Sequence, residues 1–133
     1  MHRSACYGTC PVYTVEILST GGVRFEGEEH VKVAGRQTSR VAPRDFAFLV
    51  EAIKRVDFFN LHEQYRFEPD GCTQWRTDNP TVDIVVTDAG TKKHVSYYYG
   101  CGGISVADEI RWLSDTIDEV AGSKRWVGFP DVP

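Results

Sequence analysis

The sequence predicts an α+β fold in which a single antiparallel β-sheet of about five strands carries two helices on one face, in the order βββ-α-ββ-α. Apolar and polar residues alternate in several short segments, and this period is typical of half-buried strands. Two longer segments instead repeat apolar residues at every third or fourth position, as amphipathic helices do. The strands alternate rather than running continuously apolar, which argues against a parallel sheet covered on both faces. An antiparallel sheet with both helices on one face is the economical arrangement of these elements.

The expected strands form two hairpins and one further strand. They cover residues 12–18, 23–26, 31–35, 82–87 and 94–99. Ser-Thr-Gly-Gly connects the first pair and Asp-Ala-Gly-Thr connects the last pair, and both sequences favour turns. Gly27 is expected to end the second strand, while Val31 and Val33 indicate the third strand.

The two expected helices differ in how clearly they are marked. Pro43 suits the first turn of a helix. One face of this first helix carries Phe46, Leu49, Val50 and Ile53. The apolar residues of the second helix step by four and three positions through Val106, Ile110, Leu113, Ile117 and Val120. Ser105 and Asp108 resemble a capping box before it, and Gly122 is a natural stop after it.

The length of the chain favours one domain. Its 133 residues are 41% hydrophobic and 12% aromatic, which is enough for a core that needs no metal or disulfide to fold. We expect residues 1–133 to form this domain, with a globular core at about residues 6–126 and a short C-terminal tail. Trp126 and Phe129 make that tail apolar, so we expect it to pack against the core.

Charge and hydropathy exclude two classes of partner. The net charge is −4 and the lysines and arginines are scattered, so no basic stripe indicates binding to nucleic acid. No apolar run reaches the roughly 20 residues of a transmembrane helix, so we do not expect a membrane-spanning protein. Met1 to Ser4 lead directly into the loop of Cys6 without a signal peptide. If the protein is exported, we therefore expect this sequence to be the mature part, without its signal or lipid anchor.

The four cysteines predict two disulfides and an oxidising location. Cys72 lies in an irregular loop and Cys101 ends an expected strand, so a disulfide between them would pin that loop to the sheet. The chain-entropy model gives such a ring about 3.5 kcal/mol of stabilisation. Cys6 and Cys10 enclose three residues, and the same model gives their smaller ring about 2 kcal/mol. Four cysteines allow three pairings, so pairing each distant cysteine with Cys6 or Cys10 remains the alternative.

Cys6 and Cys10 also allow two chemical interpretations besides a structural disulfide. Thiol-redox catalysts carry paired cysteines at the start of a helix, whereas this pair precedes an expected strand. The spacing Cys-x-x-x-Cys-Pro resembles that of periplasmic copper chaperones with a thioredoxin fold, although those place the motif at a helix start. This resemblance implies copper binding, with His30 or His94 as a third ligand. The leading interpretation is a disulfide with no metal and no cofactor.

Several motifs together resemble a bacterial domain family. The motifs are Cys6-x-Gly8-x-Cys10-Pro11-x-Tyr13, Gly22-x-x-x-x-x-Gly27, Asp57-Phe58-Phe59-x-Leu61, Tyr65, Thr77-Asp78-x-Pro80 and Ile117-Asp118. They occur in the same order as in that family, from Cys6 to about Trp126. The family is a domain of unknown function, found mainly in predicted exported proteins and lipoproteins. The resemblance implies a periplasmic, cell-envelope or extracellular location, but it implies no activity and no catalytic residues.

The long irregular segment at residues 62–79 is the expected binding region, because such loops in compact domains are usually pinned or functional. Exposed tyrosine and tryptophan favour binding surfaces, and Tyr65, Trp75 and Tyr98 are the candidates. Core packing is the competing interpretation of each ring. The leading functional hypothesis is an exported, disulfide-stapled domain that binds an unknown protein or envelope component and is not an enzyme. The alternative hypothesis is a copper-binding or thiol-redox protein that uses the N-terminal cysteine pair.

Overall fold

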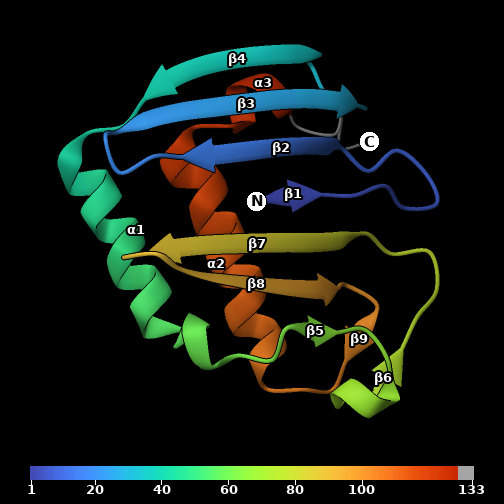
Figure 1. The fold of residues 1–133 in the computed structure, drawn as a ribbon. Helices are drawn as coiled ribbons and strands as arrows, with labels where there is room; N and C mark the ends of the chain where they lie inside the picture. The colour runs from blue at the N-terminus through green and yellow to red at the C-terminus, as the bar shows by residue number, and fades with distance from the viewer. Residues whose placement is uncertain (129–133) are drawn as a thin grey trace.

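The computed structural model describes residues 1–128 and shows two β-sheets, with helices packed on one face of the larger sheet (Figure 1). The strands are β1 His2–Arg3, β2 Val12–Ile17, β3 Gly22–Glu29, β4 Gly35–Arg40, β5 Gln64–Tyr65, β6 Gln74–Trp75, β7 Thr81–Asp88, β8 Thr91–Tyr98 and β9 Cys101–Gly102. The helices are α1 Pro43–Arg55, α2 Val106–Ala121 and α3 Lys124–Val127, with 3₁₀ turns at Phe58–Asn60 and Glu68–Asp70. The strand order of the larger sheet is β4-β3-β2-β1-β7-β8-β5, and β6 pairs with β9 in the smaller sheet.

The expectation of a single antiparallel sheet of about five strands is wrong, although the α+β class holds. The larger sheet has seven strands and is mixed. β5 runs parallel to β8, and every other pair of neighbouring strands in this sheet is antiparallel. The strands β1, β5, β6 and β9 are each two residues long, which is too short for an alternating pattern. β4 has the sequence Gly-Arg-Gln-Thr-Ser-Arg without any apolar residue, as suits a polar edge strand.

The third long strand lies later in the chain than the sequence indicates. β3 continues through Gly27 to Glu29, and residues 31–33 form a loop before β4. Two N–H groups of this loop donate to carbonyls of α3, at 3.0 and 2.9 Å, so the loop bonds to a helix instead of a strand. A β-carbon at Gly27 would contact the Val33 carbonyl, and glycine therefore lets this loop lie against β3.

The C-terminal tail packs against the core as far as the structure describes it. Trp126 is buried, and its ring centroid lies 5.1 Å from that of Phe25 on β3. Phe129, the other apolar residue named for the tail, lies outside the described residues.

The ends of the two long helices largely match the sequence pattern. Pro43 begins α1, and Gly122 ends α2 in the left-handed conformation with a φ of 67°. The expected capping box is wrong, because the Ser105 side chain makes no capping hydrogen bond. The backbone of Ser105 is already in the helical region, whereas a capping serine needs an extended backbone to reach the helix amides.

β1 joins the two halves of the larger sheet. His2 pairs with Thr14 of β2 on one side and with Asp83 of β7 on the other, and β1 is antiparallel to both strands. The β2–β3 and β7–β8 hairpins therefore become one sheet through a strand of two residues (Figure 1).

Arg3 attaches β1 to α2 through a buried polar cluster, which we call the Arg3 cluster (Arg3, Tyr13, Tyr99, Asp118 and Ser123). The guanidinium donates to the Asp118 carboxylate at 2.8 and 3.1 Å, and to the Tyr99 hydroxyl at 2.9 Å. The Tyr13 and Ser123 hydroxyls donate to the same carboxylate, at 2.8 and 2.5 Å. Because Asp118 is buried, these donors replace the water that its charge would otherwise require.

The Arg3 cluster shifts the pKa values of its members in the direction that keeps the ion pair charged. Burial disfavours the charge of Arg3, but the attraction of Asp118 and of the tyrosine oxygens outweighs burial, and the pKa of the guanidinium is raised. Burial and the negative charge of Asp118 raise the pKa of Tyr13. The Tyr13 hydroxyl therefore keeps its proton and remains a donor.

Replacing Asp118 should destabilise the domain far more than replacing its neighbour Asp115. Asp118→Ala leaves the mostly buried Arg3 charge without its buried carboxylate partner, and breaking such a pair costs about 3 kcal/mol. Asp115 contacts the same guanidinium at 3.3 Å but its side chain is 78% exposed, so Asp115→Ala should cost less than about 1 kcal/mol. Urea unfolding followed by circular dichroism measures both losses. Equal losses would show that the Arg3 cluster does not hold β1 in place.

Candidate functional site

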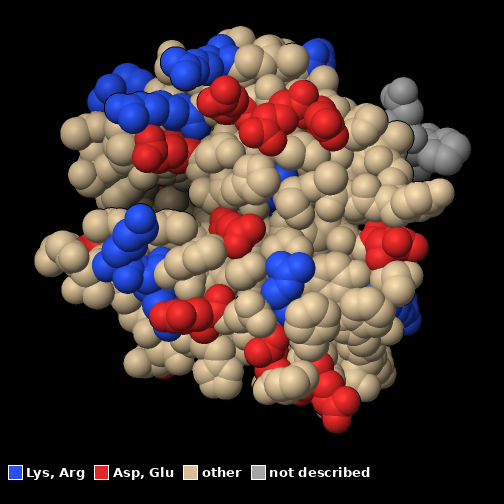
Figure 2. All heavy atoms as spheres, turned by 45° about the vertical axis from the view of Figure 1, so that its right-hand side comes forward, with Lys and Arg blue, Asp and Glu red and all other residues tan. Residues whose placement is uncertain are grey.

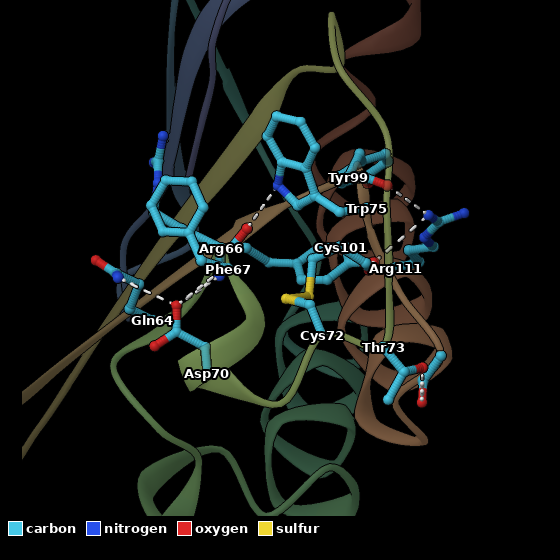
Figure 3. Close-up of a disulfide and its surroundings, with 12 residues drawn as sticks. Gln64, Arg66, Phe67, Asp70, Cys72, Thr73, Trp75, Tyr99, Cys101 and Arg111 are labelled. Atoms are coloured by element: carbon cyan, nitrogen blue, oxygen red, sulfur yellow. Dashed lines mark hydrogen bonds between the residues drawn. A yellow bond between two sulfur atoms is a disulfide. The ribbon is translucent and has the colours of Figure 1, made fainter.

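The Cys72–Cys101 disulfide lies at the centre of the candidate site (Figure 3). This pairing confirms the prediction: the two Cα atoms lie 5.1 Å apart and both residues are buried. Cys101 belongs to β9, which pairs with β6 so that Trp75 lies opposite Cys101. The disulfide and the small sheet together hold the loop between β5 and β7 against the turn that follows β8.

Backbone hydrogen bonds continue this attachment on both sides of the β6–β9 pairing. Thr73 N–H donates to the Gly102 carbonyl at 3.0 Å, and Arg76 N–H donates to the Gly100 carbonyl at 2.9 Å. Gly100 lies so close to the loop that a β-carbon would meet the Arg76 carbonyl and the Tyr98 ring, and glycine avoids this contact. The long loop is thus an ordered surface.

Asp70 closes the turn that carries Phe67. Its carboxylate accepts hydrogen bonds from the N–H groups of Arg66 and Phe67, at 2.9 and 3.1 Å, and from the Gln64 amide at 3.2 Å (Figure 3). These bonds favour the ionised form, so the bond from Arg66 N–H, followed by that from Gln64, lowers the pKa of Asp70. The hydrogen bonds of the turn therefore favour the ionised carboxylate.

Three rings form a surface beside the disulfide, which we call the aromatic patch (Phe67, Trp75 and Tyr98). Phe67 and Trp75 are each 50% exposed, and Tyr98 is half-buried. The ring centroids of Phe67 and Trp75 lie 6.4 Å apart, and those of Trp75 and Tyr98 lie 5.8 Å apart. These are separations of aromatic pairs in contact, so the three rings make one continuous surface.

The polar edges of two of these rings are bonded within the protein. The Trp75 indole N–H donates to the Arg66 carbonyl at 3.0 Å (Figure 3). The Tyr98 hydroxyl donates to the Arg76 carbonyl at 2.5 Å and accepts from Asn79 N–H at 3.3 Å. These hydrogen bonds fix the orientation of both rings.

The structure brings Trp75 and Tyr98 together, but it buries Tyr65. Tyr65 is only 6% exposed, its ring stacks on that of His62, and its hydroxyl accepts from His62 N–H at 2.8 Å. Tyr65 thus supports the loop instead of facing a partner. The sequence reasoning missed Phe67. The available signal was an aromatic residue within Arg-Phe-Glu-Pro-Asp, where no helix or strand period gives it a core position.

A second candidate region is a cavity of about 250 Å³ beside the Cys6–Cys10 disulfide. These two cysteines are paired as expected, with Cα atoms 5.6 Å apart. The cavity lies where β1 ends, and its lining is Arg3, Cys10, Pro11, Tyr13, Pro80, Thr81, Val82, Tyr99 and Asp118. The polar groups of the Arg3 cluster bond to one another there, so the cluster holds the fold instead of offering an open set of ligands.

The residues named for copper binding are not gathered into a site. In the part of the chain that the structure describes, no group of three or more histidine, cysteine, aspartate or glutamate residues could hold a metal ion. His94 Nε2 lies 2.7 Å from Asp83 Oδ1, and His30 lies in the bend after β3. The sulfur atoms of Cys6 and Cys10 are bonded to each other and are not thiolates in this state. Copper binding by the reduced protein stays a prediction.

Two features of the chain concern its location. The two disulfides indicate an oxidising, extracellular environment. α2 has 16 residues, and none of the described helices is both long and apolar enough to cross a membrane.

Comparison with known proteins identifies a family. A family model described as a domain of unknown function (DUF6438) matches residues 1–121. This match includes both disulfides and the whole aromatic patch. No curated protein and no solved structure matches the chain significantly. The chain therefore belongs to the DUF6438 family, which is defined by a domain of unknown function.

Proposed function

We propose that this chain is an exported binding domain and that its aromatic patch is the surface that contacts the partner. The observation that carries the proposal is the fixed exposure of two neighbouring rings, Phe67 and Trp75, each 50% exposed. Contiguous apolar surface on a soluble domain often marks a site of interaction. Tryptophan and tyrosine are also enriched among the residues that dominate binding energy.

The order of the patch supports the proposal energetically. Immobilising a flexible side chain on binding costs about 0.5–1.5 kcal/mol. Trp75 and Tyr98 are already held through their polar atoms, and the Cys72–Cys101 disulfide holds the backbone that carries Trp75. Binding therefore retains more of the free energy that is gained when the rings are covered.

The proposed partner is a protein or another component of the bacterial cell envelope, and the proposed location is the periplasm, the envelope or the exterior. Support comes from the two disulfides and from the resemblance of the sequence motifs to a family of exported proteins and lipoproteins. We further propose that residues 1–133 act as a single domain, since the described sheet and long helices share one hydrophobic core.

A second candidate function uses the Cys6–Cys10 disulfide as a redox pair or, after reduction, as a copper site. Its position favours this: both cysteines are partly exposed, and the cavity of about 250 Å³ lies beside Cys10. Exposed disulfides are more often labile or regulatory than buried ones. Thiol titration in redox buffers and copper(I) titration of the reduced protein test this candidate. It is excluded if the disulfide stays oxidised under mild reduction and the fully reduced protein takes up no copper.

Removing the indole of Trp75 should weaken partner binding without unfolding the domain. Trp75→Ala and Phe67→Ala should each lower the affinity for the host's envelope fraction at least about tenfold, because such anchors typically contribute about 2 kcal/mol or more. Phe48→Ala is the matched control, since Phe48 is 57% exposed on α1, outside the patch. Co-sedimentation of the oxidised domain with this fraction gives the affinities. The proposal fails if Trp75→Ala and Phe48→Ala bind alike.

The two disulfides should contribute unequally to stability. In the chain-entropy model, opening the ring with Cys72→Ser and Cys101→Ser costs about 3.5 kcal/mol, against about 2 kcal/mol for Cys6→Ser with Cys10→Ser. The first double variant also leaves hydroxyls in the core, which adds to its cost. Urea unfolding measures both losses, and only the first variant should lose affinity for the envelope fraction. The reverse order would contradict the structural role given to Cys72–Cys101.

Acid should loosen the turn that carries Phe67. Because the pKa of Asp70 is lowered in the folded protein, its stabilising effect is present above the ordinary value of 3.8 and is lost as the pH falls through the lowered value. The amide protection factors of Arg66 and Phe67, measured by NMR hydrogen exchange, should fall in that range. Asp70→Asn should lower them already at neutral pH, and Asp78→Asn, in the same loop, should not. Unchanged protection in Asp70→Asn would mean that the carboxylate is dispensable.

A further inference from the structure

β4 forms one outer edge of the larger sheet. It is the last strand in the order of that sheet, and it pairs with β3 along its whole length, from Gly35 to Arg40. Among the strands that the structure describes, none pairs with the other side of β4. We call that side the β4 edge (Arg36, Thr38 and Arg40).

The three residues of the β4 edge direct their backbone groups away from β3. Val41 N–H, just after the strand, donates to the Gly21 carbonyl at 2.8 Å, so the odd-numbered residues of this segment bond toward β3. Residues two apart on an antiparallel strand direct their N–H and C=O groups to the same side. Arg36, Thr38 and Arg40 therefore direct theirs outward, where another extended backbone can pair with them.

The side chains of the same three residues point to the open face of the sheet. Phe25 of β3 packs against Trp126 of α3, so Phe25 points to the face that the helices cover. Gln37 lies opposite Phe25 and shares that face. Successive side chains of a strand alternate between the faces, so the side chains of the β4 edge point to the open face, and all three residues are exposed there.

The β4 edge is basic, although the chain as a whole is acidic. The basic residues are scattered along the chain, but residues 30–44 contain four of them and no aspartate or glutamate, against a net charge of −4 for the chain. Figure 2 shows lysine and arginine side chains along the top of the molecule, where β4 lies. The Arg36 side chain is 87% exposed and lies 3.9 Å from the Glu26 carboxylate. Arg40 donates to the Thr20 carbonyl at 2.7 Å. A guanidinium has five N–H groups, so both arginines keep donors for a further carboxylate.

We propose that the β4 edge binds an extended acidic segment of a partner protein, which adds to the larger sheet as a further strand. The backbone of β4 supplies the pairing, and the arginines select carboxylates. β4 lies at one end of the sheet order, whereas β8, which carries Tyr98 of the aromatic patch, lies near the other end. The proposal therefore does not rest on the function proposed for the patch.

The alternation along β4 predicts the sequence pattern of the bound segment. The residues opposite Arg36 and Arg40 lie on the open face, four positions apart, so we expect aspartate or glutamate at both. The residue between them on that face lies opposite Thr38, where a β-branched side chain packs well. The remaining residues lie beside Gln37 and Ser39 on the other face, and both of these are polar. We therefore expect polar residues in those positions.

The charges of β4 favour an acidic partner over a second copy of this chain. Antiparallel pairing of β4 with β4 of a second copy about Thr38 would place Arg36 opposite Arg40, and like charges directly opposite each other are destabilising. Charged side chains at a sheet edge also limit indiscriminate pairing. An acidic strand is not repelled in this way, because it gains ion pairs in addition to the backbone hydrogen bonds.

Hydrogen exchange measured by NMR tests the proposal. The probe is a short capped peptide of threonine and valine with two glutamates four positions apart, placed symmetrically so that either strand direction fits. Saturating peptide should raise the amide protection of Arg36, Thr38 and Arg40 at least about tenfold, because each N–H gains an acceptor. The amides of Gln37 and Ser39 already bond toward β3 and should change little. This alternation distinguishes strand pairing from general shielding of the surface.

Two control peptides separate charge from strand pairing. A peptide with lysine in place of both glutamates should bind at least about tenfold more weakly, because it meets the arginines with like charge. The glutamate peptide with proline at its centre keeps its charge but cannot complete the pairing, and it should give no protection. Added salt should weaken binding of the glutamate peptide, since exposed charges are screened.

A pair of variants tests the role of the arginines. Arg36→Glu with Arg40→Glu should reverse the preference, so that the lysine peptide protects the β4 edge and the glutamate peptide does not. Lys54→Glu with Lys92→Glu makes the same change in net charge at exposed positions on α1 and β8, and it should keep the preference for glutamate. If the arginine variant does not fold, the comparison of the glutamate and lysine peptides makes the same test on the unaltered protein.

Three outcomes would overturn the proposal. One is unchanged exchange at Arg36, Thr38 and Arg40 in excess glutamate peptide. Another is equal protection by the peptide with the central proline, which would mean attraction of charge without strand pairing. The third is slow exchange of the same amides in the dilute free protein, which would show that the chain itself already covers the β4 edge.

Discussion

The two-residue strand β1 is the constraint on which the rest of the structure depends, because it makes one sheet out of two hairpins. Pairing over two residues is weak by itself, so the side chain of Arg3 supplies the contacts that secure it. Its guanidinium reaches Asp118 on α2 and the hydroxyls of Tyr13 and Tyr99, and strand, sheet and helix thus share one buried cluster. A cavity lies beside Cys10 where β1 ends, and an apolar groove lies beside Met1 between the sheet and α1.

The two disulfides act on different parts of this architecture. Cys72–Cys101 is buried in the core. It also positions the aromatic patch, since the strand that carries Trp75 pairs directly with Cys101. Cys6–Cys10 instead closes the connection between β1 and β2, where both cysteines are partly exposed. The second disulfide therefore restricts the chain just after Arg3, and it does so without adding to the core.

The sequence was sufficient to predict an element where the segment is long enough to show a hydrophobic period. It was also sufficient where a residue has a single conformational role. Both long helices, the two hairpins and both disulfide pairs could be predicted in this way. Two-residue strands are too short to show a hydrophobic period. β5 forms by pairing in parallel with the edge of β8, which is a tertiary contact, and Tyr65 is buried there. In the site, the outward position of Trp75 could be inferred from its irregular surroundings. The Arg3 cluster could not, because Arg3 and Asp118 are 115 positions apart and a single sequence does not pair them.

The groups that the aromatic patch leaves to solvent determine what the proposed binding surface can select. The Trp75 indole N–H and the Tyr98 hydroxyl already donate to backbone carbonyls, so under the proposed function a partner would be selected chiefly by its shape and its apolar surface. Tyr98 of β8 also pairs with Thr81 of β7, so the patch is attached directly to the larger sheet. The patch therefore joins the disulfide-held loop to the larger sheet, and a partner that covered its three rings would contact both.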